Sequence, residues 1–206
     1  MSNLLVTTIQ DKDGGSTITV PTSGTFTLGA GWIWLETLTA SASATLDSEV
    51  TAGYDGTYKD VVYTLTDIMP ATDGTDIWIR VKDSTYQADA ADYEYGVHGQ
   101  ASSGAFNNAT SQGAAQILLN CGDNVGSEAD EGISGIVRLS SPDNATRPAG
   151  FQWEMLWWDD QATPVLFKDN GGGAYNGSFN AITGVRFMMS SGNITSGTIQ
   201  VYGVQS

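Results

Sequence analysis

The only histidine of the chain, His98, limits the hydrolytic chemistry that its side chains can perform. A Ser-His-Asp triad needs an imidazole beside a nucleophile. Ser134, in Gly132-Ile-Ser-Gly135, lacks the Gly-x-Ser-x-Gly turn that exposes such a serine. One histidine and one cysteine also cannot build a usual zinc site. We therefore interpret His98 as a strand residue or an interface hydrogen-bond donor.

Glu154 is the best candidate for an acid in glycoside hydrolysis, because Trp153 and Trp157 flank it in the sequence. This reaction needs two carboxylates on either side of the sugar. Sandwich-fold glucanases typically place them as Glu-x-Asp-x-Glu along one strand, and here Met155 and Leu156 follow instead. We expect Glu154 to be a structural carboxylate or a hydrogen-bond acceptor for a ligand, and the chain to have no enzymatic activity.

Three acidic clusters offer oxygen ligands of the kind that calcium prefers. None matches Asp-x-Asp-x-Asp-Gly followed by a distal Glu. We expect no cofactor, with calcium in the segment from Cys121 to Gly132 as the alternative. The clusters are Asp11 with Asp13; Asp123 with Glu128, Asp130 and Glu131; and Asp159 with Asp160 and Asp169.

The charge of the chain argues against nucleic acid as a partner. Eight Lys and Arg against 23 Asp and Glu give a formal net charge of -15, which repels a phosphate backbone. The single Cys121 excludes an intrachain disulfide framework, so packing or oligomerisation must supply stability. The sequence shows neither an export signal nor an apolar run of membrane-spanning length, so we expect no membrane insertion.

The elements that position these residues are predicted to be mainly β-strands. Apolar and polar residues alternate, and Gly, Asn, Asp, Ser or Pro interrupts them about every 8 to 12 residues. The pattern predicts strands near 3–9, 16–20, 25–28, 32–39, 42–47, 59–68, 76–82, 93–99, 114–120, 133–140, 150–158, 164–168, 181–190 and 196–204. Segments 100–113, 121–132 and 169–180, rich in Gly, Ser, Asn and Asp, are expected to be loops.

Two of the predicted strands show which side chains face the core. Between Asp76 and Lys82, one face carries Ile77, Ile79 and Val81, while the other carries Trp78 and Arg80. Residues 151–158 carry a heavy apolar stripe opposite a mixed face, and this is typical of a central strand. The stripe consists of Phe151, Trp153, Met155 and Trp157, and the mixed face of Gln152, Glu154, Leu156 and Trp158.

Antiparallel strands with one wet face predict an all-β protein, an antiparallel β-sandwich of the jelly-roll type over residues 32–206. Residues 1–31 form a separate, short and extended N-terminal β arm that is poor in large apolar side chains. We expect this arm to serve attachment or oligomer contact. The aromatic side chains on the solvent-exposed faces are candidates for an interface or for glycan contact, and we favour the interface. These side chains are Trp32, Trp34, Trp78 and Trp158.

Several segments resemble proteins of tailed-bacteriophage virions. The first is Gly15-Ser-Thr-Ile-Thr-Val-Pro-Thr-Ser-Gly-Thr-Phe-Thr-Leu-Gly29, part of which is similar to a segment recurrent in trimeric tail fibres. A longer resemblance, over about residues 32–204, is to a widespread set of phage and prophage proteins, mostly virion structural proteins without associated enzymatic residues. It is carried by Leu35-Glu-Thr-Leu-Thr-Ala-Ser-Ala-Ser-Ala-Thr-Leu46, Tyr58-Lys-Asp-Val-Val-Tyr63, the segment from Ile68 to Arg80, Ile182-Thr-Gly-Val-Arg-Phe187 and the closing segment from Ser190 to Gly203.

This resemblance implies a non-enzymatic virion structural protein on the outer surface of the particle. We expect a capsid cement or decoration protein that stabilises the head as a homotrimer and contacts the major capsid protein or tail proteins. The alternative is a short tail fibre or receptor-binding module that recognises host-surface glycan through Trp78, Trp158 and the loops near 100–113 and 169–180. A glycan-cleaving adhesin that uses Glu154 is a third, less favoured reading. The sequence does not choose between capsid and tail.

Overall fold

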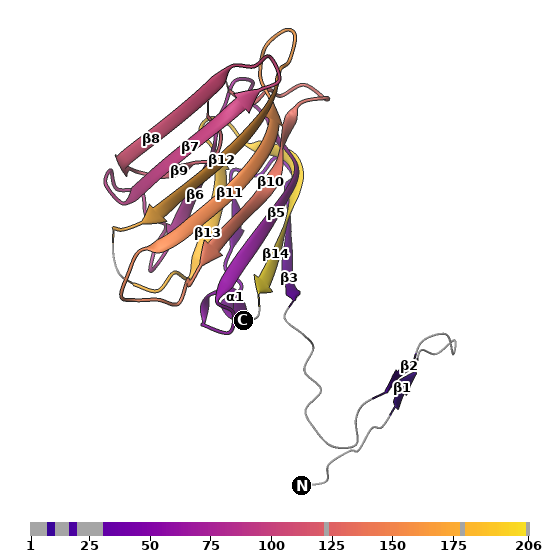
Figure 1. The fold of residues 1–206 in the computed structure, drawn as a ribbon, viewed down its shortest axis with the longest axis vertical. Coiled ribbons are helices and arrows are strands. Elements are labelled where there is room, and N and C mark those ends of the chain that lie inside the picture. Colours follow the sequence, from indigo (N-terminus) through magenta and orange to yellow (C-terminus); the bar gives the residue numbers. More distant parts are fainter. Residues whose placement is uncertain (1–7, 11–16, 20–30, 122–123, 178–179, 205–206) are drawn as a thin grey trace. The chain divides into compact units, whose positions relative to one another are not determined.

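The structure is a computed structural model that describes residues 8–10, 17–19, 31–121, 124–177 and 180–204. Almost all regular structure in these ranges is β-strand, with one helix of a single turn (Figure 1). The elements are β1 (Thr8–Gln10), β2 (Thr17–Thr19), β3 (Trp32–Thr39), β4 (Leu46–Ser48), α1 (Thr51–Tyr54), β5 (Asp60–Pro70), β6 (Ile77–Lys82), β7 (Tyr93–Ala101), β8 (Phe106–Ala114), β9 (Ile117–Leu118), β10 (Gly132–Ser140), β11 (Ala149–Trp158), β12 (Leu166–Tyr175), β13 (Gly184–Met189) and β14 (Ile194–Val204).

The chain divides into two compact units, Met1–Gly31 and Trp32–Ser206. In the first unit, β1 and β2 pair antiparallel, with Ile9 opposite Ile18. Two strands of three residues are too short to form an independently stable sheet. The predicted strand at 25–28 and most of the one at 3–9 lie outside the described residues.

The second unit consists of two antiparallel sheets that pack face to face, which confirms the predicted β-sandwich. The large sheet has eight strands in the order β3-β14-β5-β10-β11-β12-β7-β8, and the small sheet has four in the order β4-β13-β6-β9. In Figure 1 the small sheet lies behind the large one. Several strands that are neighbours in a sheet are not consecutive in the chain. Some of the segments that connect the strands therefore cross from one sheet to the other.

The core lies between the two sheets and has the residues that alternation predicted. Ile77, Ile79 and Val81 of β6 are fully buried. On β11, the fifth strand of the large sheet, the apolar stripe is buried and the mixed face is exposed. The Trp157 ring stacks on Phe167 of β12, with centroids 4.5 Å apart. Burying such a side chain contributes about 1.5–3 kcal/mol to stability.

Two of the three segments expected to be loops are largely strands. β8 occupies most of 100–113, and β12 continues to Tyr175 through Asn170-Gly-Gly-Gly173. Gly171 is required by packing rather than by a turn, because a Cβ there would lie 2.2 Å from the Trp153 indole. The glycine at 171 therefore lets the Trp153 side chain approach the β12 backbone closely. The described part of 121–132 is irregular up to Gly132, as predicted.

Candidate functional site

The four tryptophans singled out by the sequence do not form one patch. Trp32 and Trp34 point outward from β3, an edge strand of the large sheet, and are 51% and 59% exposed. Trp158 is 38% exposed on the outer face of central β11. Trp78 lies on the outer face of the small sheet, on the other side of the sandwich, where its register partners are Met188 and Leu118.

The pair on β3 is held in place by the neighbouring strand and by its own strand. The Trp32 and Tyr202 rings are in tilted contact, with centroids 5.6 Å apart. Trp34 Nε1 donates a hydrogen bond to Thr37 Oγ1 at 3.2 Å. A pocket of about 340 Å³ beside Trp32 reaches Val62, which is nearly inaccessible although it faces away from the core. The outer face beside Trp32 therefore combines apolar side chains with the polar groups of Arg138, Gln152 and Glu154.

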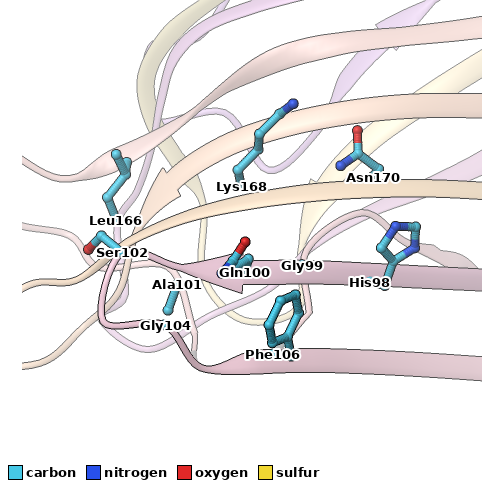
Figure 2. A pocket seen from close by; sticks show the side chains of 10 residues that line it. All are labelled: His98, Gly99, Gln100, Ala101, Ser102, Gly104, Phe106, Leu166, Lys168 and Asn170. Atoms are coloured by element: carbon cyan, nitrogen blue, oxygen red, sulfur yellow. The ribbon is translucent and has the colours of Figure 1, made fainter.

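A second pocket lies at the opposite end of the large sheet and has a different lining (Figure 2). It has a volume of about 600 Å³ and lies over β12, β7 and β8. The strand register places Asn170 opposite His98, and Gln100 between Lys168 and Phe106. Phe106 is 77% exposed, the largest fraction among the exposed large hydrophobic side chains of the described residues. The pocket thus combines one open aromatic ring with amide and imidazole groups.

Glu154 lies on the outer face of β11 in an exposed ion pair. Glu154 pairs with Lys168 at 3.1 Å, and both side chains are more than half exposed. Its cross-strand partners are Ile136 and Asn170, so neither adjacent strand places a carboxylate directly opposite. The tryptophans that flank Glu154 in sequence are buried on the other face of β11, since side chains alternate along a strand.

His98 and Ser134 are also kept apart. Ser134 lies on β10 and His98 on β7, three strand positions away in the large sheet, which amounts to about 14 Å. Ser134 Oγ instead accepts a hydrogen bond from the Asp67 backbone N–H at 3.0 Å. The structure therefore assembles no nucleophile and base pair from these two residues.

The acidic clusters considered for calcium have structural contacts. Asp159 accepts hydrogen bonds from Val165 N at 2.7 Å and from Gln161 Nε2 at 2.9 Å, which closes the turn between β11 and β12. Glu131 Oε2 accepts one from Glu128 N at 2.7 Å. Across the described ranges, no three His, Cys, Asp or Glu side chains come close enough to hold a metal ion. The predicted ligands Asp11, Asp13 and Asp123 lie outside those ranges.

Asp169 is a buried carboxylate directly behind the second pocket. Its Oδ2 accepts hydrogen bonds from Cys121 N at 2.7 Å and from Trp157 Nε1 at 2.8 Å. Its Oδ1 has no hydrogen-bond partner among the described residues. Burial raises the pKa of Asp169. Burial, with Asp169 nearby, also raises the pKa of the Cys121 thiol to about 12, so Cys121 is not a thiolate nucleophile at neutral pH.

Sequence reasoning named the two segments that supply most of the second pocket as possible glycan-recognition loops, but it did not predict the pocket itself. Gln100, Phe106 and Asn170 lie in segments expected to be loops, so no strand face was assigned to them. The alternation of Phe106, Asn108 and Thr110 was the available signal, but it contains only one large apolar side chain.

Neither the helical content nor the comparisons with known proteins assign a function to the chain. Within the described residues, the single helix has four residues, which is too short to cross a bilayer. Comparisons of the chain with protein-family models, with curated proteins and with solved structures found no match.

Proposed function

We propose that this chain is a non-enzymatic structural protein on the outer surface of a tailed-bacteriophage particle. Within that class we favour a capsid cement or decoration protein, a homotrimer that stabilises the head by contacting the major capsid protein. The sequence resemblance over about residues 32–204 supports the class. The observation that carries the contact role is the exposed pair of tryptophans on β3.

Two neighbouring exposed indoles favour a protein interface. Trp32 and Trp34 lie on the same face of one strand and leave more than half of their surface to water. Tryptophan is enriched at the centre of protein interfaces, where its burial contributes much of the binding free energy. Water around these rings would be released when a partner covers them.

The position of this pair at a sheet edge adds to the argument. β3 pairs only with β14, so its other edge is free of sheet partners in the described part of the chain. Such edges attract further strands unless charges, prolines or bulges blunt them. β3 has one charged residue, Glu36, which accepts a hydrogen bond from Ser48 at 2.6 Å. It also has a bulge at Leu35. Because the bulge interrupts the ladder, contact here would use the indoles more than backbone pairing.

The N-terminal unit is consistent with an attachment role. The strands β1 and β2 have three residues each, and an isolated hairpin of this size is marginal in water. A small unit of this kind gains stability by pairing with a neighbouring subunit or another protein. This is the clamp expected of a cement protein.

Light scattering on the full-length chain tests the contact role. We expect a trimer, and we expect Trp34→Asp to dissociate it because the variant places a charge where the indole would be buried. Trp158→Asp is the matched control, since Trp158 is also an exposed tryptophan of the large sheet but lies on a central strand. A monomer at high concentration, or dissociation by Trp158→Asp alone, would contradict the proposal.

Electron microscopy of particles labelled with an antibody against this chain tests its location. Label distributed over the head supports a cement protein. Label confined to the tail tip would overturn the cement role, and it would favour the receptor-binding alternative.

A further inference from the structure

We propose that the pocket over β12, β7 and β8 is a binding site for a neutral saccharide. The site is independent of the interface proposed at β3, because β3 and β8 are the two opposite edges of the same sheet. It includes parts of the segments 100–113 and 169–180 that the sequence suggested for glycan contact, but neither Trp78 nor Trp158 lines it.

The polar groups of the pocket form an array suited to hydroxyl recognition. His98, Gln100 and Asn170 come from two adjacent strands, and Asn170 is the register partner of His98. None of these three side chains donates or accepts a hydrogen bond with another described residue. Amide and imidazole groups both donate and accept, so they match neighbouring hydroxyls of a sugar ring. Their rigid strand positions lower the entropy cost of binding.

Phe106 supplies the apolar contact that such a ligand needs. It follows the turn between β7 and β8, and its backbone pairs with Gln100. With 77% of its surface exposed, the ring is open for a flat ligand. The C–H faces of a pyranose are apolar and stack on aromatic rings, while its hydroxyls point sideways toward polar groups. Figure 2 shows Phe106 on the strand next to His98 and Gln100.

The charge around the pocket selects a neutral ligand. The chain has 23 Asp and Glu, yet none of them lines this pocket. Its one lysine, Lys168, already pairs with Glu154 on the neighbouring strand. An anion would meet the acidic remainder of the protein, and a cation would find no carboxylate in the lining. The volume of about 600 Å³ is within the range typical of small-molecule sites.

Saturation-transfer NMR and calorimetry on the full-length chain test the site. The probes are methyl glucoside, methyl galactoside, N-acetylglucosamine, lactose and maltose at millimolar concentrations, with galacturonate as the charged comparison. We expect at least one neutral probe to bind and galacturonate to bind more weakly. If no neutral probe binds, or if galacturonate binds best, the proposal is wrong.

Substitutions identify the pocket. We expect Phe106→Ala and Gln100→Ala each to weaken binding about tenfold, equivalent to about 1.4 kcal/mol. Thr195→Ala, at an exposed position of β14 far from the pocket in the strand order, is the control and should bind like the wild type. Unchanged binding by Phe106→Ala would place the ligand elsewhere and overturn the assignment.

The oligomeric state of the same samples separates this proposal from the cement role. A trimeric Phe106→Ala variant that has lost saccharide binding supports both. If Phe106→Ala dissociates the trimer, the face is a protein interface, and the saccharide site is wrong. If the wild type binds saccharide but is monomeric, the saccharide site holds and the trimer does not.

Discussion

The two edges of the large sheet expose different aromatic side chains. At the β3 edge, the outward side chains include Trp32 and Trp34, and the pocket beside Trp32 is lined by Val62 and Val204 together with Arg138, Gln152 and Glu154. At the β8 edge, one open ring, Phe106, lies among amides and hydroxyls. Both edges belong to one sheet with a shared core. The comparison teaches that backbone pairing determines which strands lie at the edges, while the outward-facing side chains of each edge strand determine what that edge can contact.

The two halves of the sheet also differ in their buried polar groups. Near β3, the Tyr54 hydroxyl hydrogen-bonds to the Tyr63 hydroxyl at 2.7 Å and to Ser48 at 2.9 Å. The Ser48 hydroxyl in turn donates a hydrogen bond to Glu36. In the other half, Asp169 leaves one carboxylate oxygen without a partner among the described residues. Buried polar groups that are unsatisfied cost free energy. The free oxygen of Asp169 is therefore an energetic cost on the pocket side of the sheet that the Tyr54, Tyr63 and Ser48 network does not carry.

The largest expected effect comes from the strand that joins the halves. Trp157→Ala should lower the free energy of unfolding by about 3–5 kcal/mol, because it removes the stacking on Phe167 and the bond to Asp169. Trp158→Ala, the next residue but on the outer face, should change it by about 0.5 kcal/mol. Urea denaturation of both variants measures the difference. Equal losses would show that the inner and outer faces of β11 are misassigned.

A smaller effect tests the glycine-rich strand of the pocket half. Gly171→Ala should destabilise the protein by about 1–3 kcal/mol, since its Cβ would overlap the Trp153 indole. Gly150→Ala on the adjacent strand is the matched control, because nothing lies within 4 Å of a Cβ there. Thermal unfolding compares the two. A neutral Gly171→Ala would mean that β12 does not pack against Trp153 as described.

The buried carboxylate of the pocket half predicts a pH dependence. Because burial raises the pKa of Asp169, the stability linked to its protonated form is complete below the unfolded pKa, near 3.9, and is lost as the pH rises through the higher folded pKa. Asp169→Asn should therefore become more stable relative to the wild type as the pH rises from about 4 to 7. Denaturant unfolding at several pH values measures this. Parallel stability curves for the two proteins would contradict the burial of an ionisable Asp169.

The smallest expected effect on stability concerns the N-terminal unit. Removal of residues 1–31 should leave the unfolding midpoint of the sandwich nearly unchanged, because the chain divides into separate compact units at Gly31. The truncated protein should no longer attach to particles in a sedimentation assay. Loss of folding would show that the arm belongs to the sandwich core, and retained attachment would assign particle binding to the sandwich.

Alternation along each strand was predictable because it depends only on local geometry. The inner residues Ile77 and Ile79 and the outward Trp158 follow from the period of two. The bounds of β3 agree with the predicted 32–39. β8 was not predictable in the same way, since its polar and small residues carry little apolar signal and the strand is held mainly by pairing with β7.

The sequence by itself determined the fold class and the faces of the clearest strands, since these depend on residue type and spacing. The tertiary structure alone decided which strands are neighbours. It placed Trp78 on the opposite side of the sandwich from Trp158, and it brought His98, Asn170 and Phe106 into one pocket. The physical reason is that antiparallel pairing joins segments about 70 residues apart, such as His98 and Asn170, through backbone hydrogen bonds that any side chain permits.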